Sequence, residues 1–295
     1  MKYTVPALAL AVACGFSPSL QAQTRQHTVY VSVVDSKGEP ATGLTVNDFR
    51  VKEDGAVREV LDVAPATEPI SVALLVDDSQ ATQQATQMIR EAVDDFITTL
   101  AGKAEISLST FGERPTLLAD YTTDTAKLRS AAKRIFPRQG AGAYLMDAIV
   151  DVSRGFQKRE SARGGAIVVL MIDDAVEFSN RNYDNVVSEL QKSRAALHII
   201  SLGTQSSSLN DEMRNRNQSI ALGTERTGGR RDNVLALTAA APKMKQMAAE
   251  LINQYKVTYG RAETLIPPEK LEVTVTKPGL TARAPNRTAQ TGAKK

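Results

Sequence analysis

The sequence predicts an α/β fold, a doubly wound and mostly parallel sheet, with a small β unit formed by the N- and C-terminal segments. Wholly apolar runs at Ile70–Val76 and Ala166–Ile172 are typical of parallel strands that are covered on both faces. Between such runs, apolar residues recur at helical spacing, as at residues 85–100 and 145–156. Strands that alternate with amphipathic helices predict a doubly wound, Rossmann-like sheet.

The first 22 residues have the pattern of a secretory signal peptide. Lys2 precedes an apolar run at residues 5–16, and a small residue, Ala22, ends the segment. The run is too short to span a bilayer, which takes roughly 20 apolar residues. A buried N-terminal helix is the alternative, but no cap or amphipathic pattern follows. We therefore expect residues 1–22 to be removed and the mature chain, without a transmembrane helix, to be periplasmic or extracellular.

The single cysteine leaves the mode of export open. Cys14 follows a weak lipoprotein-type motif, in which Ala11 stands where a bulkier aliphatic residue is usual, so a lipid anchor at Cys14 is an alternative to cleavage after Ala22. Cleavage after Ala22 would leave a chain without cysteine, which tolerates an oxidising compartment without using disulfides.

Composition excludes several classes of function. One Cys, two His and no Trp rule out zinc fingers, haem attachment and disulfide scaffolds. The formal net charge of +3 is too small to indicate nucleic-acid binding, and much of it lies in a basic tail after residue 276. The remainder of the mature chain is mildly acidic.

The pattern divides the mature chain into four segments. Residues 28–66 form an N-terminal β segment, in which Asp54-Gly55 between alternating runs predicts a tight hairpin. Residues 68–254 form the α/β domain after a linker at 64–69, with a last helix that starts near Pro242. Residues 255–284 return to β character and are expected to pack on the N-terminal segment, and residues 285–295 are expected to be a disordered tail.

Paired acids follow two of the apolar strands. Asp77 and Asp78 come after Ile70–Val76, and Asp173 and Asp174 come after Ala166–Ile172. Ligands of open α/β sheets bind beyond the carboxyl ends of the strands. Neighbouring carboxylates there repel one another unless they are protonated, solvated or bound to a cation, and oxygen ligands suit Mg²⁺ or Ca²⁺. The alternative is that these acids cap helices and face water.

The order of these motifs resembles that of a von Willebrand factor type A domain. Asp77-x-Ser79 at the end of a strand, Gly142-x-x-x-x-Asp147-Ala148 before a helix, and Asp173 after an apolar strand carry the resemblance. The leader at residues 34–55 and the segments 227–229, 255–259 and 271–275 are similar to bacterial exported proteins of the acidobacterial type A-related family. The resemblance covers roughly residues 28–283.

The resemblance implies a metal-ion-dependent adhesion site that binds an acidic group of a partner protein. Carried over by position, the metal ligands would be Asp77, Ser79 and Asp173. The sequence departs from the family where hydroxyl residues are replaced by Ala81 and Ala143, and where Asp174 replaces the usual glycine. Since Mg²⁺ takes about six oxygen ligands, water or the auxiliary carboxylates Asp78 and Asp174 would have to complete the shell. We therefore expect a degenerate site that binds Mg²⁺ or Ca²⁺ weakly or is empty.

The leading hypothesis is a non-catalytic, exported protein-interaction module with an unidentified protein partner and no nucleic acid. A structural or assembly component of the cell envelope, with no functional metal site, is the alternative. A metal-dependent hydrolase using Asp77 and Asp173 is a third reading, but it lacks a nucleophile and a base. There is neither a complete phosphate-binding glycine loop nor a G-x-S-x-G motif, and His198 is expected to be a satisfied core residue. Arg226, Arg230 and Arg231 are expected in a solvated loop.

Overall fold

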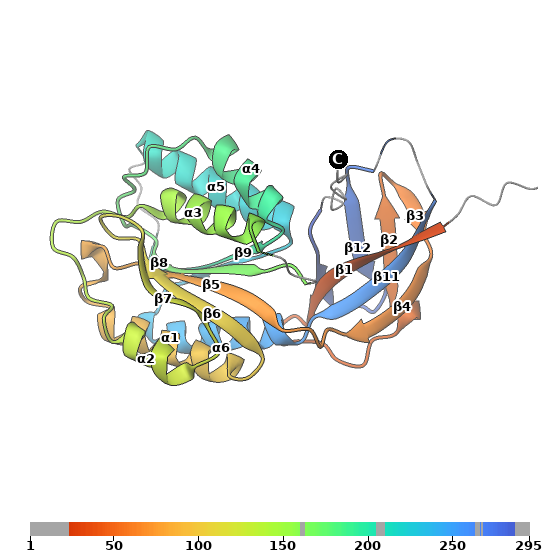
Figure 1. The fold of residues 1–295 in the computed structure, drawn as a ribbon, viewed down its shortest axis with the longest axis horizontal. Helices are drawn as coiled ribbons and strands as arrows, with labels where there is room; N and C mark the ends of the chain where they lie inside the picture. Colours follow the sequence, from red (N-terminus) through yellow and green to blue (C-terminus); the bar gives the residue numbers. More distant parts are fainter. Residues whose placement is uncertain (1–23, 160–162, 205–209, 263–265, 267, 287–295) are drawn as a thin grey trace, which may run out of the picture.

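The computed structural model describes residues 24–159, 163–204, 210–262, 266 and 268–286. The chain forms two parts that lie side by side (Figure 1). One part is a sheet between two layers of helices, and the other is a β unit built from both ends of the chain. The predicted fold class is confirmed in both respects.

In the described part of the chain, the central sheet has six strands in the order β10-β9-β8-β5-β6-β7, of which only β7 runs antiparallel to its neighbour. In that order the strands are β10 (Arg231–Val234), β9 (Ala196–Leu202), β8 (Ala166–Ile172), β5 (Ile70–Val76), β6 (Ala104–Thr110) and β7 (Thr116–Thr122). Strands β5 and β8 are buried along their whole length, as their apolar sequences predict. β10 was not expected.

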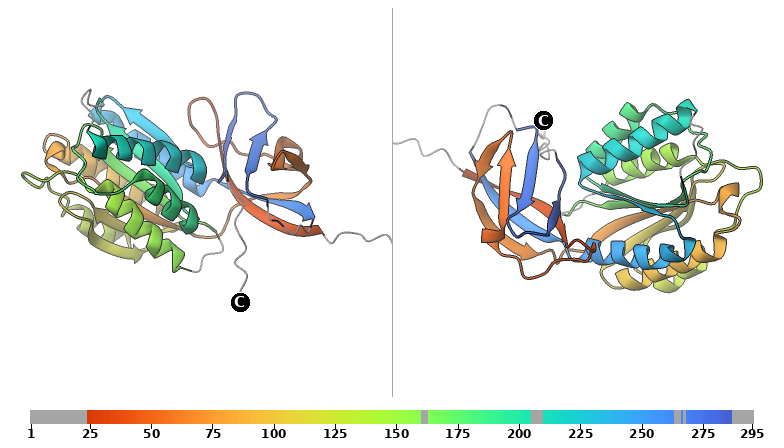
Figure 2. Two further views of the ribbon diagram at one scale, coloured as in Figure 1. Left: turned by 90° about the horizontal axis from the view of Figure 1, so that it is seen from above. Right: turned by 180° about the vertical axis from the view of Figure 1, so that it is seen from behind.

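Helices cover both faces of this sheet (Figures 1 and 2). On one face lie α1 (Thr86–Leu100), α2 (Thr125–Ala132) and α6 (Ala240–Ile252), and on the other α3 (Leu145–Gln157), α4 (Tyr183–Ser193) and α5 (Asp211–Thr227). The carboxylate of Asp124 caps α2 by accepting hydrogen bonds from two backbone amides of its first turn. Helix α5 was not predicted, because its sequence is mostly polar.

The β unit joins the two ends of the chain. One sheet has the order β13-β1-β11-β4 and the other the order β12-β2-β3. The strands are β1 (Thr24–Val34), β2 (Phe49–Glu53), β3 (Ala56–Arg58), β4 (Val60–Pro65), β11 (Tyr255–Ala262), β12 (Leu271–Val275) and β13 (Thr281–Arg283). Asp54 and Gly55 both have positive φ (48° and 83°), which confirms the tight hairpin between β2 and β3. The linker predicted at residues 64–69 is shorter in the structure, since β4 extends to Pro65.

Buried ion pairs and hydrogen bonds hold the two parts together. The carboxylate of Glu250 on α6 accepts from Arg230 (2.7 Å), which directly precedes β10, and from Arg283 (3.1 Å) in β13. Arg163, before β8, donates to the carbonyl oxygens of Glu68 (2.9 Å) and Leu251 (2.6 Å) within the α/β part, and its guanidinium lies 5.5 Å from the ring centroid of Tyr30 on β1. These contacts lie near the amino ends of the strands. The carboxyl ends of the strands therefore point away from the β unit (Figure 1).

Several predictions concern the ends of the chain. The signal peptide at residues 1–22, the lipid-anchor alternative at Cys14 and most of the expected tail lie outside the described residues. Asn286, at the start of that tail, accepts a backbone hydrogen bond from Leu271 (2.8 Å) and donates one to Arg226 (3.2 Å). Within the part of the chain that the structure describes, there is no helix of the length and apolarity needed to cross a bilayer.

Candidate functional site

Asp77 and Asp173 leave neighbouring parallel strands. β5 pairs with β8, and the amide of Asp77 donates to the carbonyl oxygen of Leu170 (2.9 Å). The chain turns to opposite sides of the sheet at β5 and β8, so the two aspartates lie at the topological switch point, where open α/β sheets bind their ligands. The predicted adjacency is confirmed, while the role of these residues as metal ligands remains a prediction.

The carboxylate of Asp77 ties the end of β5 to the end of β8. It is fully buried, and its oxygens accept backbone hydrogen bonds from Ser79 (2.8 Å) and Ile172 (3.1 Å). Burial raises the pKa of Asp77 above its ordinary value, while these hydrogen bonds act to lower it. Each carboxylate oxygen of Asp77 is therefore already engaged in a hydrogen bond to the backbone.

Asp173 and Ser79 retain unused oxygen atoms. The side chain of Asp173 is 1% exposed, and Oδ1 accepts from Arg231 (2.9 Å). Its Oδ2 and the hydroxyl of Ser79 are buried and have no partner among the described residues. Buried polar atoms are rarely left unpaired, so these two atoms mark a position where water, an ion or a partner group would be held.

Arg216 on α5 supplies a positive charge beneath this position. It is fully buried and donates to the carbonyl oxygens of Asp173 (2.8 Å) and Ala175 (2.7 Å). Burial lowers the pKa of Arg216, and the charges of Glu177, Asp173 and Asp77 oppose that change. The guanidinium therefore stays protonated. Together with Arg231, it compensates the charge of the buried aspartates from within the protein.

The auxiliary carboxylates are directed elsewhere. Asp78 accepts from the amide of Gly112 (2.6 Å) and from Nε of Arg138 (2.9 Å). A Cβ atom at position 112 would lie 2.7 Å from the carboxylate of Asp78, so glycine is required for this approach. Asp174 is exposed, and no ion pair involves it in the described part of the chain.

The two alanines at the family's hydroxyl positions differ in their surroundings. Ala81 is exposed in the short helix η2 (Gln80–Thr82). Ala143 is fully buried, where its amide donates to Val176 (2.7 Å) and its carbonyl oxygen accepts from Phe178 (2.8 Å). Neither offers an oxygen ligand from its side chain.

These residues do not fit a tight divalent-cation site. Within the described ranges, no group of three or more His, Cys, Asp or Glu side chains is placed to hold a metal ion. Among the three predicted ligands, only the hydroxyl of Ser79 and Oδ2 of Asp173 are buried without a described partner, whereas Mg²⁺ takes about six ligands. Arg216 and Arg231, which contact Asp173, already provide the positive charge that a metal ion would bring to this position.

A further acid, Glu177, lies close to the same position. Its Oε1 accepts from the amide of Ser179 (3.1 Å), and its Oε2 has no described partner. Burial raises the pKa of Glu177 to about 7. Residue 177 also forms an isolated β-bridge with Ala143, which places it beside the loop that opens α3.

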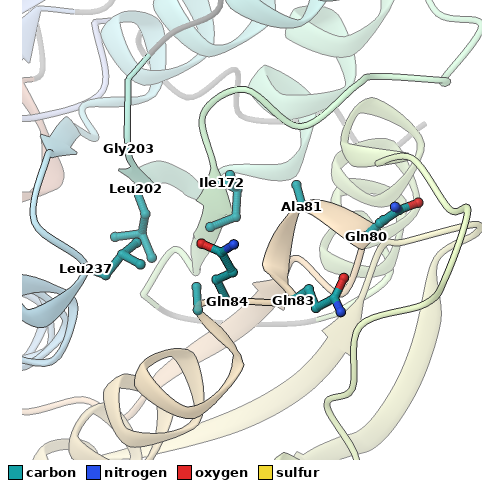
Figure 3. A pocket seen from close by; sticks show the side chains of 9 residues that line it. Gln80, Ala81, Gln83, Gln84, Ile172, Leu202, Gly203 and Leu237 are labelled. Carbon is teal, nitrogen blue, oxygen red and sulfur yellow. The ribbon is translucent and has the colours of Figure 1, made fainter.

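Two hollows open on this rim, and Gln80 and Ala81 of η2 line both. The first, of about 380 Å³, lies between the side chains of Gln83 and Gln84 and those of Leu202 and Leu237 (Figure 3). The second, which we call the Phe178 hollow, measures about 280 Å³. It is lined by Ser79, Gln80, Ala81, Gly140, Ala141, Gly142, Asp174, Ala175, Val176 and Phe178.

Two predictions about residues near the site are wrong. Arg230 and Arg231 do not belong to a solvated loop: Arg230 is buried in an ion pair with Glu250, and Arg231 begins β10 and contacts Asp173. His198 is a core residue but is not satisfied, because neither ring nitrogen has a partner in the described structure. Burial lowers the pKa of His198 to about 3.

Arg216 and Arg231 were missed as site residues. Charged side chains are almost never fully buried unless they are paired. An arginine is therefore expected at the surface when its partner cannot be recognised in the neighbouring sequence. The one available signal is the helical spacing of Met213, Arg216 and Ile220, which places Arg216 on the inner face of α5.

Comparisons with known proteins agree with this architecture. Residues 72–176 match the sequence model of the von Willebrand factor type A domain. A structure of a von Willebrand factor type A protein from Catenulispora acidiphila aligns with a TM-score of 0.52 and 12% identity, covering 85% of this chain and 74% of that one. The pilus adhesin SpaC from Lactobacillus rhamnosus GG aligns with a TM-score of 0.51 and 10% identity, covering 87% of this chain and 47% of that one.

At these identities the solved structures show a shared fold and nothing about activity. No curated protein matches the sequence. The match of residues 72–176 includes β5, β6, α3 and β8, and therefore both strands from which Asp77 and Asp173 emerge. Residues 72–176 are therefore similar in sequence to the von Willebrand factor type A domain, and the α/β part of this chain shares its fold with the solved type A structure.

Proposed function

We propose that this protein is an exported, non-catalytic interaction module whose rim of strand ends binds another protein. The site is a degenerate metal-ion-dependent adhesion site formed by Asp77, Ser79 and Asp173, with Mg²⁺ or Ca²⁺ bound weakly or not at all. One observation carries the proposal: the hydroxyl of Ser79 and Oδ2 of Asp173 are buried and unpartnered at this rim.

The surface beside these atoms supports a protein as the ligand. Val176 and Phe178 are apolar yet 46% and 51% exposed, and both line the Phe178 hollow. Exposed apolar side chains that gather beside a concave site mark interaction surfaces. The rim points away from the β unit, so that unit does not cover it (Figure 1). The fold is shared with a pilus adhesin, which is a binding protein by its name.

The geometry gives no support to hydrolysis. Asp77 accepts two backbone hydrogen bonds, and Asp173 accepts one from Arg231, so neither carboxylate is placed as a free base beside a nucleophile. Export rests on the signal-peptide pattern of residues 1–22, and a lipid anchor at Cys14 remains the alternative to cleavage after Ala22. The weak net charge supports the absence of nucleic acid from the partners.

The alternative is a structural or assembly component of the cell envelope that uses other surfaces. One observation favours it: Val57 on β3 and Leu61 on β4 are 67% and 39% exposed, so the β unit also carries apolar surface. In that case Asp77 and Asp173, whose charges the neighbouring arginines compensate, would have no binding role.

Photo-crosslinking in intact cells separates the two readings. A photoreactive residue would replace Phe178 at the rim or Val57 on the β unit, both of which are more than half exposed. The interaction module predicts a defined adduct from position 178 that is lost when Ser79→Ala is combined with it. Adducts from position 57 alone would favour the assembly component and contradict the proposal.

A further inference from the structure

The Phe178 hollow has one charged residue in its lining. Asp174 is exposed there, and no described residue forms an ion pair with it. We infer that the hollow receives a basic side chain, lysine or arginine, of the partner protein. This inference rests on the proposed function and specifies the chemistry of the partner.

The walls of the hollow suit the aliphatic stem of such a side chain. Ala81, Ala175 and Val176 present small or apolar groups, and the ring of Phe178 is half exposed. A Cβ atom at position 142 would lie 2.3 Å from the Phe178 ring, so Gly142 allows the ring to pack against the loop. Lysine and arginine bury their methylene stems along apolar surface, and their cationic heads are attracted to aromatic rings.

The size of the hollow fits one side chain. Pockets for small molecules and cofactors usually measure about 300–1,000 Å³, and this hollow, at about 280 Å³, falls just below that range. The hydroxyl of Ser79, which is 1% exposed and unpartnered, provides an acceptor in the lining for an N–H group of the incoming side chain.

Among the described residues that line this hollow, none carries a positive charge that an acidic side chain could contact. Arg138 is paired with Asp78 (2.9 Å) and Glu113 (3.1 Å), and Arg231 is paired with Asp173 (2.9 Å). The unpaired charge of the hollow is therefore negative. A site centred on a metal ion attracts acidic groups, whereas the exposed carboxylate of Asp174 in this hollow attracts basic ones.

The experiment uses ¹⁵N-labelled mature protein and three peptides as probes. They are acetyl-glycyl-arginyl-glycine amide, the same peptide with neutral citrulline, and the same peptide with glutamate. We expect the arginine peptide to shift the amide resonances of residues 140–142 and 174–178, the citrulline peptide to bind more weakly, and the glutamate peptide to leave them unchanged.

Asp174→Asn should weaken binding of the arginine peptide by a factor of about 1.4–5, since exposed ion pairs contribute about 0.2–1 kcal/mol. Asp151→Asn is the matched control, because Asp151 is an exposed acid on α3 that does not line the hollow. It should leave the affinity unchanged.

Equal binding of the arginine and glutamate peptides, or no change with Asp174→Asn, would overturn the inference. Shifts confined to residues outside the hollow would overturn it as well. The proposed function is judged separately by crosslinking at position 178. A specific adduct there, combined with a preference for the glutamate peptide, would leave the interaction module standing and reject only its basic partner.

Discussion

Replacing Arg231 by methionine tests whether a guanidinium takes the place of a metal ion beside Asp173. Methionine keeps much of the length of the side chain and removes its charge. Arg231 is the sole described side-chain partner of Asp173, and the two side chains are 28% and 1% exposed. The variant would therefore leave a buried carboxylate without a described hydrogen-bond partner.

The expected loss of stability follows from this geometry. Breaking a buried ion pair costs about 3–5 kcal/mol, and the partial exposure of Arg231 lets water reduce this to about 2–3 kcal/mol. For a protein of this size, that loss lowers Tm by roughly 5–10 °C. Arg181→Met is the matched control: Arg181 is also 28% exposed, but its partner Asp147 is 25% exposed. It should cost less than about 1 kcal/mol.

Urea unfolding followed by far-UV circular dichroism measures both variants, since the chain has no Trp for fluorescence. Ca²⁺ should then stabilise Arg231→Met more than the wild type, by about 1.4 kcal/mol when its concentration is ten times the dissociation constant. The reasoning is refuted if Arg231→Met costs no more than Arg181→Met, or if Ca²⁺ stabilises the wild type as much as the variant.

Three further predictions address the alanine positions, the core histidine and the junction between the two parts. Ala81→Ser combined with Ala143→Thr adds two hydroxyl ligands and should raise Ca²⁺ affinity about tenfold or more in calorimetry; no gain would mean that these positions are misaligned with the family. Burial holds the pKa of His198 at about 3, against 6.5 in the unfolded chain, so the unfolded state binds more protons between these values and stability falls as pH drops through that window. The slope is about 1.4 kcal/mol per pH unit, and His198→Leu should remove it in urea unfolding at pH 4.5–6.5; equal slopes in both proteins would contradict the assignment. Glu250→Gln weakens a buried carboxylate's contacts with two arginines and should destabilise the protein by about 3 kcal/mol; a loss below about 1 kcal/mol would show that this cluster does not hold the two parts together.

The sequence was sufficient where the physical signal is local. Continuous apolar runs predicted β5 and β8, and Asp54-Gly55 predicted the hairpin because a two-residue turn of this kind requires positive φ. The positions of Asp77 and Asp173 after their strands followed from the same runs. Their adjacency needed the pairing of β5 with β8, which the parallel α/β pattern implies.

The signal failed where burial depends on distant partners. Helix α5 exposes many polar residues, so its periodicity is weak, yet its inner face carries Arg216 to the carbonyl oxygens of Asp173 and Ala175. Arg231 lies in a four-residue edge strand that is mostly polar, and only the fold brings its guanidinium to Asp173. The charge balance of the site could not be predicted without these contacts.

The central claim is that Arg216 and Arg231, rather than a tightly held metal ion, supply the positive charge beside Asp173. Calorimetric titration of the mature wild-type protein with Mn²⁺, Mg²⁺ and Ca²⁺, beside Asp77→Ala and Ser79→Ala, tests it most directly. We predict at most weak binding, with dissociation constants in the range of about 10⁻⁴–10⁻³ M or above. Binding in the micromolar range that disappears in Ser79→Ala would contradict the claim.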